Sequence, residues 1–211
     1  MPPPREHVLL VEGKDDREVV YQLCNHHHLD NQNLFTVEAK DGYERLRDDL
    51  SVRLRVPALR TIGTIIDADT NLADRWHSVC AVLARSGYKE LPAAPAEDGT
   101  ILAAQGRLPR FGIWVMPDNR LSGMLEDFIQ HLVHDGDPLL PRAQTSVDGI
   151  PAAERRFQEV HRSKALIHTW LAWQQEPGTP LGLAVTRRYL DTNHALAQRF
   201  LTWLRTLFST P

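Results

Sequence analysis

Apolar and polar residues follow two different periods along this chain, and the period changes from one short block to the next. Unbroken apolar runs rich in β-branched residues are typical of strands buried on both faces, whereas apolar residues three or four positions apart are typical of amphipathic helices. The predicted strands are the runs at 7–12, 34–39, 61–66 and 111–116. Segments with helical spacing lie between them, most clearly at 72–83. This alternation predicts an α/β fold with a parallel sheet and right-handed crossovers.

The rest of the chain is predicted to be mainly helical. A short strand is expected near 100–103, and Ser122 can cap a helix that follows the last long strand. Turn residues indicate a loop over 134–151, and the helices expected after it span 152–162, 164–174 and 193–208. We therefore expect an α/β domain over residues 5–135 and a helical C-terminal extension over residues 150–211 that packs on it.

Three carboxylates come directly after two of the predicted strands. Glu12 follows the first strand, and Asp67 and Asp69 follow the strand at 61–66. Open α/β sheets place their sites at the carboxyl ends of strands, and acids that converge there repel one another unless a cation shares the site. Carboxylate oxygens suit Mg²⁺ or Mn²⁺. We therefore interpret the three acids as metal ligands, with Glu12 alternatively a general base acting through a bound water.

The two aspartates have a rival interpretation, because aspartate is also common at helix starts. Thr70 or Asn71 can cap the next helix equally well, so capping does not require both acids. In an extended backbone, side chains two residues apart point the same way, which would let one ion bind Asp67 and Asp69 together. Metal binding is therefore the preferred interpretation.

Composition narrows the class of protein. The chain has 211 residues, 42% hydrophobic and 24% charged, with a formal net charge of −3, which argues against a strongly basic nucleic-acid coat but leaves room for a local patch. No apolar run approaches the roughly 20 residues of a membrane span, and the first residues lack the apolar region of a signal peptide. Cys24 and Cys80 fall in predicted helices and are expected to be reduced, buried thiols. A cytoplasmic protein without membrane contact is expected.

The two acidic motifs resemble those of the TOPRIM fold. Val-Glu-Gly-Lys-Asp-Asp at 11–16 and Ile-Asp-Ala-Asp at 66–69 stand at the ends of strands in the order that this fold requires. The resemblance covers residues 7 to about 133, and extends to OLD-family nucleases and to small, stand-alone bacterial TOPRIM proteins of uncharacterised function. It implies a TOPRIM/Rossmann-like sheet and a Mg²⁺- or Mn²⁺-dependent nuclease that cleaves phosphodiester bonds.

The resemblance to OLD-type nucleases also implies two further site residues. Glu126 looks like their additional metal-binding acid, although a solvated helix acid is nearly as good an account, and Asp127 is its near equivalent. Lys164 looks like their catalytic lysine. The chain has no Gly-x-x-x-x-Gly-Lys-Ser/Thr motif, so an ATPase half like that of OLD proteins is expected to be missing or to be supplied by another chain. The same resemblance suggests a role in bacterial defence against phage.

Lys164 has two interpretations from the pattern alone. In one continuous helix over 152–173, it would sit in the middle of an apolar stripe with Phe157, Val160, Ile167 and Leu171. An inward ammonium group requires an anionic partner, such as a substrate phosphate or the acid cluster. Alternatively, Ser163 begins a new helix and the lysine faces solvent. Both interpretations stay open.

The expected partner is nucleic acid, with DNA favoured over RNA, and the candidate phosphate contacts are Lys14, Arg187 and Arg188. Two other functions compete with nuclease activity. One is a non-catalytic TOPRIM module that binds or assembles other molecules, which three bare carboxylates argue against. The other is a metal-dependent phosphohydrolase that acts on nucleotides.

Overall fold

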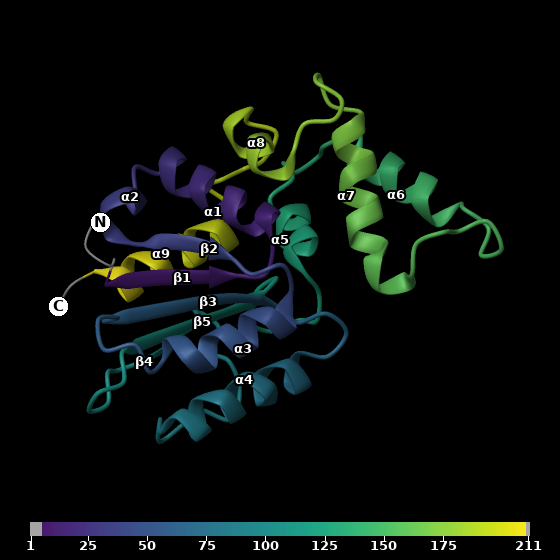
Figure 1. Ribbon diagram of the computed structural model, residues 1–211. Helices are drawn as coiled ribbons and strands as arrows, with labels where there is room; N and C mark the ends of the chain where they lie inside the picture. The colour runs from purple at the N-terminus through teal and green to yellow at the C-terminus, as the bar shows by residue number, and fades with distance from the viewer. Residues whose placement is uncertain (1–5, 210–211) are drawn as a thin grey trace.

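A five-stranded sheet forms the centre of the molecule. The computed structural model describes residues 6–209 (Figure 1). The strands are β1 (His7–Val11), β2 (Thr36–Ala39), β3 (Thr61–Asp67), β4 (Thr100–Leu102) and β5 (Arg110–Met116). Their order across the sheet is β2-β1-β3-β5-β4, with every pair parallel except β4 with β5. The predicted α/β fold with a mostly parallel sheet is therefore confirmed.

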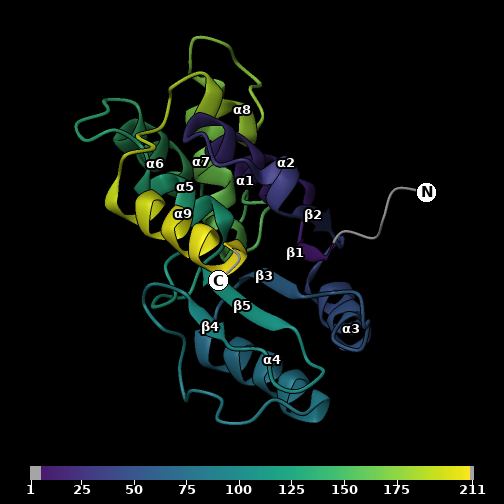
Figure 2. The ribbon, with the colours of Figure 1, turned by 90° about the vertical axis from the view of Figure 1, so that its left-hand side faces the viewer.

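Helices cover both faces of this sheet. They are α1 (Lys14–His26), α2 (Asn31–Leu34), α3 (Tyr43–Arg53), α4 (Leu72–Ser86), α5 (Leu125–His131), α6 (Leu140–Asp148), α7 (Arg162–Ala172), α8 (Leu181–Thr186) and α9 (Ala195–Phe208), with a short 3₁₀ turn at Glu159–His161. Helices α3 and α4 lie on one face, and α1, α5 and α9 lie on the other (Figures 1 and 2). Helices α6 and α7 extend to one side of the molecule, at the right of Figure 1.

Alternation along the strands divides the core into two clusters. In β1, Val8 and Leu10 pack towards α3 and α4, whereas Leu9 and Val11 pack towards α1 and α9. All four side chains are buried, because successive strand residues point to opposite faces and both faces are covered. This explains why the strands appear in the sequence as unbroken apolar runs rather than alternating ones.

Helix α9 lies directly against the sheet, and glycines in two strands permit its close approach. A Cβ atom at Gly112 would lie 2.4 Å from Leu207 Cδ2, and one at Gly63 would lie 2.9 Å from the same atom. Aromatic rings fill the adjoining space, with Trp114 and Phe200 at 5.2 Å between ring centroids. The helical C-terminal residues are thus part of the core beneath the sheet.

The structure differs from the sequence predictions between 134 and 186. The predicted loop contains α6, because Asp137 Oδ1 accepts hydrogen bonds from the backbone N–H groups of Leu139 and Leu140 at the start of that helix. The helix predicted over 152–162 is instead turns and the 3₁₀ segment. No residue from 151 to 160 is buried, so a helix there would lack the packing that stabilises short helices. Helix α8 was not predicted.

No helix between residues 6 and 209 is both long enough and apolar enough to cross a bilayer.

Candidate active site

The carboxyl ends of β1 and β3 bring Glu12 and Asp67 together. The two strands are neighbours, with Val11 opposite Ile65, so the residues that follow Val11 and Ile65 emerge at the same edge of the sheet. Glu12 Oε1 accepts a hydrogen bond of 2.8 Å from the backbone N–H of Asp67. This contact spans 55 residues of sequence and holds the first predicted acid against the second.

Asp67 is held in turn by helix α5. Its Oδ1 atom accepts a hydrogen bond of 3.0 Å from the backbone N–H of Leu125, the first residue of that helix. Glu12 and Asp67 each use one carboxylate oxygen in these bonds, which leaves the second oxygen of each for another partner. Backbone amides therefore fix both side chains without neutralising their charge.

Asp16 is a further acid close to Glu12 and Asp67, with no role predicted for it beyond its place in the motif at 11–16. Its Oδ2 atom accepts a hydrogen bond of 2.9 Å from the N–H of Gly13 and thereby caps α1. Its Oδ1 atom is buried and has no hydrogen-bond partner among the described residues, and the whole residue is only 7% exposed. Its place in the motif after Glu12 and Gly13 was the available signal.

Glu126 and Lys164 form an ion pair close to Asp67. Glu126 is 3% exposed, and its Oε1 atom lies 3.2 Å from Lys164 Nζ. Helix α7 begins at Arg162, so the continuous helix over 152–173 does not form, yet the lysine still reaches an anionic partner. Its side chain remains 51% exposed, which leaves the ammonium group accessible from the cleft. Burial lowers the pKa of Lys164, but the charge and hydrogen bond of Glu126 outweigh this, and the pKa is raised overall.

Asp69 lies in a different environment from Asp67. The strand ends at Asp67, and Asp69 has a left-handed backbone with φ of 50°, so the extended geometry that would align the two side chains does not continue. Its carboxylate pairs with Arg75, whose guanidinium lies 3.7 Å from the centroid of the Tyr43 ring. Asp69 is not among the residues that line the cleft. Its metal-binding role remains a prediction.

The acids surround a cleft of about 430 Å³. It is lined by Glu12, Gly13, Lys14, Asp15, Asp16, Asp41, Gly42, Asp67, Leu125, Glu126 and Lys164. Six carboxyl groups thus face two ammonium groups. Of the three residues predicted to contact phosphates, Lys14 is at this cleft and exposed, whereas Arg187 pairs with Glu176 and Arg188 is exposed elsewhere.

Burial and mutual repulsion raise the pKa values of the cleft acids. Burial, with a smaller contribution from Asp69, raises the pKa of Glu12 to about 7 against the lowering effects of the Asp67 backbone and Arg75. Burial, followed by the charge of Glu12, raises the pKa of Asp16 to about 7. Burial and the neighbouring acids Asp16, Glu12 and Glu126 raise the pKa of Asp67 well above its usual range. The site therefore concentrates more negative charge than its own cations compensate.

The carboxylate oxygens of the cleft are chemically suited to bind a hard divalent cation. Carboxylate oxygens are the preferred ligands of Mg²⁺ and Mn²⁺, and the unpartnered Asp16 Oδ1 is an acceptor without a donor. Over residues 6–209, however, no three His, Cys, Asp or Glu side chains lie close enough to form a ready cluster for an ion. The amides of Asp67 and Leu125 and the ammonium of Lys164 occupy oxygens that an ion would otherwise share.

Comparison with models of protein families shows which family the chain belongs to. The model of the family described as "Protein of unknown function (DUF3226)" matches residues 6–209. The chain belongs to the DUF3226 family. No curated protein matches it.

Solved structures with a similar fold come from the C-terminal region of the OLD protein of Xanthomonas campestris pv. campestris. The structure phased with mercury is 18% identical, with a TM-score of 0.40, over 92% of this chain and 84% of that one. The structure phased with platinum is 16% identical, with a TM-score of 0.38, over 92% of this chain and 82% of that one. The similarity to these structures extends over most of the chain, and at these identities and TM-scores nothing about activity follows from it.

Proposed function

We propose that this DUF3226 protein is a nuclease that uses Mg²⁺ or Mn²⁺ to cleave phosphodiester bonds. The observation that carries the proposal is the convergence of Glu12, Asp16, Asp67 and Glu126 on one cleft, with the pKa values of the first three raised. The resemblance of the two acidic motifs to the TOPRIM pattern supports the same chemistry.

A structural role alone does not account for this arrangement. Burying several carboxyl groups together is costly, because each loses hydration and each repels the others. Apolar residues of similar size would pack at the same positions without that cost. A cation that binds the cluster would offset the repulsion, and clusters of perturbed carboxyl groups occur most often at functional sites.

Each residue of the cleft would have a distinct role in this reaction. A bound divalent ion would activate water and neutralise the phosphate oxygens, and Glu12, Asp67 and Asp16 would hold it. Glu12 would alternatively act as the general base and accept a proton from the attacking water through the carboxylate oxygen that the Asp67 N–H does not use. Glu126 would position Lys164, whose ammonium group would face the negative charge that develops on the phosphate. Asp69 would join the ligands only by exchanging its partner Arg75.

A nucleotide phosphohydrolase is the second candidate, because the cleft volume of about 430 Å³ also suits a small molecule. The same ion and the same acids would serve that reaction. The two functions differ in substrate, and one panel of substrates separates them.

The test is incubation of the purified protein with Mg²⁺ or Mn²⁺ and plasmid, single-stranded DNA, structured RNA or nucleotides. We expect cleavage of a polymer that EDTA abolishes. Asp67→Asn should reduce cleavage to background, since asparagine keeps the acceptor for the Leu125 N–H but removes the charge. The matched control is Asp98→Asn, at an exposed position outside the cleft, which should retain wild-type cleavage.

Cleavage by Asp67→Asn at the wild-type rate would show that the assigned cleft is not the catalytic site. Release of phosphate from nucleotides, without cutting of any polymer, would favour the phosphohydrolase.

A further inference from the structure

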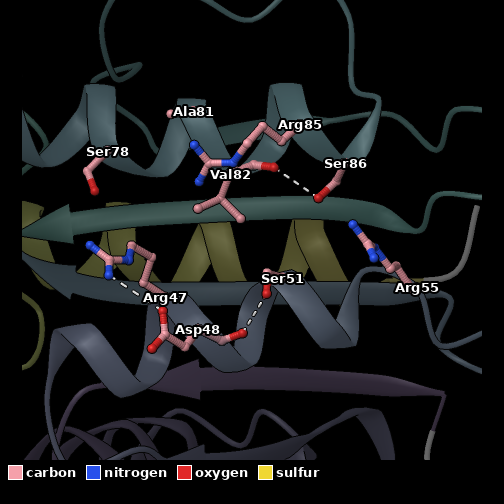
Figure 3. Close-up of a pocket in the computed structure, with 9 residues that line it drawn as sticks. All are labelled: Arg47, Asp48, Ser51, Arg55, Ser78, Ala81, Val82, Arg85 and Ser86. Atoms are coloured by element: carbon pink, nitrogen blue, oxygen red, sulfur yellow. Dashed lines mark hydrogen bonds and ion pairs between the residues drawn. The ribbon is translucent and has the colours of Figure 1, made fainter.

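A groove rich in arginine lies between α3 and α4, on the face of the sheet away from α9. It has a volume of about 460 Å³ (Figure 3). Arg47 and Arg55 project from the α3 side and Arg85 from the α4 side. The hydroxyl-bearing residues Ser51, Ser78 and Ser86 also line it, and Asp48 is its one acid among the described residues. A groove of this composition is suited to an anion rather than to an apolar ligand.

The groove continues into two further hollows at the amino ends of β3 and β5. A hollow of about 630 Å³ shares Arg55 with the groove and adds Arg60 and Arg107. A third, of about 770 Å³, shares Arg60 with the second and adds Arg110. We call this row the arginine path. Its members are Arg47, Arg85, Arg55, Arg60, Arg107 and Arg110.

Most of these arginines have no acidic partner. Within the part of the chain that the structure describes, the guanidinium groups of Arg55, Arg60, Arg85 and Arg107 make no ion pair or hydrogen bond, in contrast to Arg162, which pairs with Asp148 at 2.7 Å. Arg47 and Arg110 are the exceptions in the path, since Arg47 pairs with Asp48 and Glu44, and the Arg110 guanidinium donates a hydrogen bond of 3.0 Å to the backbone carbonyl of Thr206. In a chain with a net charge of −3, this row is a local excess of positive charge.

One end of the path lies beside the acid cleft. The guanidinium of Arg47 is 6.0 Å from the centroid of the Tyr43 ring, and Arg75 lies over the same ring at 3.7 Å. Arg75 pairs with Asp69, which follows the strand end that carries Asp67. Helix α3 has 11 residues and is therefore about 16 Å long. The path runs along it from the carboxyl ends of the strands, where the cleft lies, to their amino ends, where Arg60 and Arg110 lie.

We propose that the arginine path binds the phosphodiester backbone of a nucleic acid whose scissile phosphate lies at the acid cleft. Arginine matches phosphate through its planar fork of donors. The Ser51 and Ser86 hydroxyls already donate to the backbone carbonyls of Asp48 and Val82, whereas the Ser78 hydroxyl makes no hydrogen bond among the described residues and can add a phosphate contact. A free phosphate or nucleotide would need only one hollow, whereas three hollows joined by shared arginines fit a repeating anion. The choice of nucleic acid as the ligand rests on the proposed nuclease function. The acid cleft would act on the scissile phosphate, and the arginine path would bind the adjacent phosphates of the same strand.

The experiment measures binding of a fluorescent duplex oligonucleotide by anisotropy in EDTA, so that cleavage plays no part. The test variant is Arg55→Ala/Arg85→Ala. Each phosphate contact contributes a slope of about −0.9 to the dependence of log K on log salt, or roughly eightfold in affinity at about 0.1 M salt. The double variant should therefore bind roughly sixtyfold more weakly, with the slope reduced by about 2.

Two more variants make the result specific. Arg45→Ala removes an arginine from the same helix whose side chain is 74% exposed, pairs with Asp41 and lies outside the path, so it should bind as the wild type does. Arg107→Ala changes an exposed loop residue and should weaken binding roughly eightfold, which tests the path without altering either helix. Circular dichroism verifies that each variant is folded.

Equal binding by the wild type, the double variant and Arg107→Ala would overturn the proposal. It would also be overturned if the wild type bound phosphatidylserine vesicles through Arg55 and Arg85 but bound no oligonucleotide. The binding assay contains EDTA and therefore does not measure cleavage. Either result would leave the proposed nuclease activity to be tested independently by the assay on Asp67→Asn.

Discussion

Replacing Glu12 by glutamine should stabilise the metal-free protein above neutral pH and change it little at about pH 5. Glutamine keeps an oxygen that can accept the hydrogen bond from the Asp67 N–H, so the backbone at the end of β3 keeps its anchor. The substitution removes only the charge that burial and the neighbouring acids disfavour. The variant therefore isolates the electrostatic cost of the cleft.

The magnitude follows from the pKa of Glu12, which is raised from 4.5 to about 7, chiefly by burial. Each pKa unit corresponds to about 1.4 kcal/mol, so ionised Glu12 costs the fold roughly 3 kcal/mol above pH 7. In a chain of this size, that corresponds to a rise in Tm of roughly 6–12 °C for the variant.

The direction of the pH dependence follows from proton binding. Between about pH 4.5 and 7, the unfolded chain has released the Glu12 proton while the folded chain retains it, so stability falls as pH rises through this window. Below it, Glu12 is neutral in both states and the charge makes no difference. The stability gained by Glu12→Gln should therefore appear progressively from pH 4.5 to 7.

The assay is urea unfolding in EDTA at several pH values, followed by tryptophan fluorescence. Glu154→Gln provides the control, because Glu154 is exposed and remote from the cleft. A destabilised Glu12→Gln protein at pH 8, or a gain equal at pH 5 and pH 8, would refute the assignment of Glu12 to a charge-strained cluster.

Two further variants test other parts of the account. Lys164→Met should lower kcat on the order of 100-fold with KM little changed, because it removes a charge that acts on the developing transition state, and initial rates beside the exposed control Lys89→Met would measure this. An unchanged kcat would reduce Lys164 to a structural partner of Glu126. Gly112→Ala should destabilise the fold by roughly 1–3 kcal/mol, because the new Cβ would lie 2.4 Å from Leu207 Cδ2. In urea unfolding, the cost of Gly112→Ala should be smaller in a Leu207→Ala background; if both backgrounds show the same cost, the contact between α9 and the sheet is not as described.

The sheet was predictable because its strands are buried on both faces and therefore leave unbroken apolar runs in the sequence. The helices over 140–148 and 181–186 were not, since short helices of this kind depend on tertiary contacts more than on pattern. The segment 152–162 has apolar residues at helical spacing, but no other element packs over them, and the segment does not form an α-helix.

The candidate site was predictable in part for the same physical reason. Strand ends in a parallel sheet meet at one edge, so the proximity of Glu12 and Asp67 followed from their positions in the sequence. Asp16 was indistinguishable from an ordinary helix cap, and it does also cap α1. The pairing of Asp69 with Arg75 depends on a left-handed backbone that no local pattern announced.

Binding of Mn²⁺ in the absence of substrate tests the central claim most directly. Titration calorimetry at about pH 8, where the cleft acids can ionise, should detect a site in the wild type that is lost in Asp67→Asn and retained in Asp98→Asn. A second titration at about pH 6.5 should show more proton release on binding than the titration at about pH 8, because the pKa values of Glu12 and Asp16 are raised to about 7 and a cation would displace the protons that they carry at the lower pH. A wild-type protein that binds no divalent ion, or an Asp67→Asn protein that binds it equally well, would contradict the account.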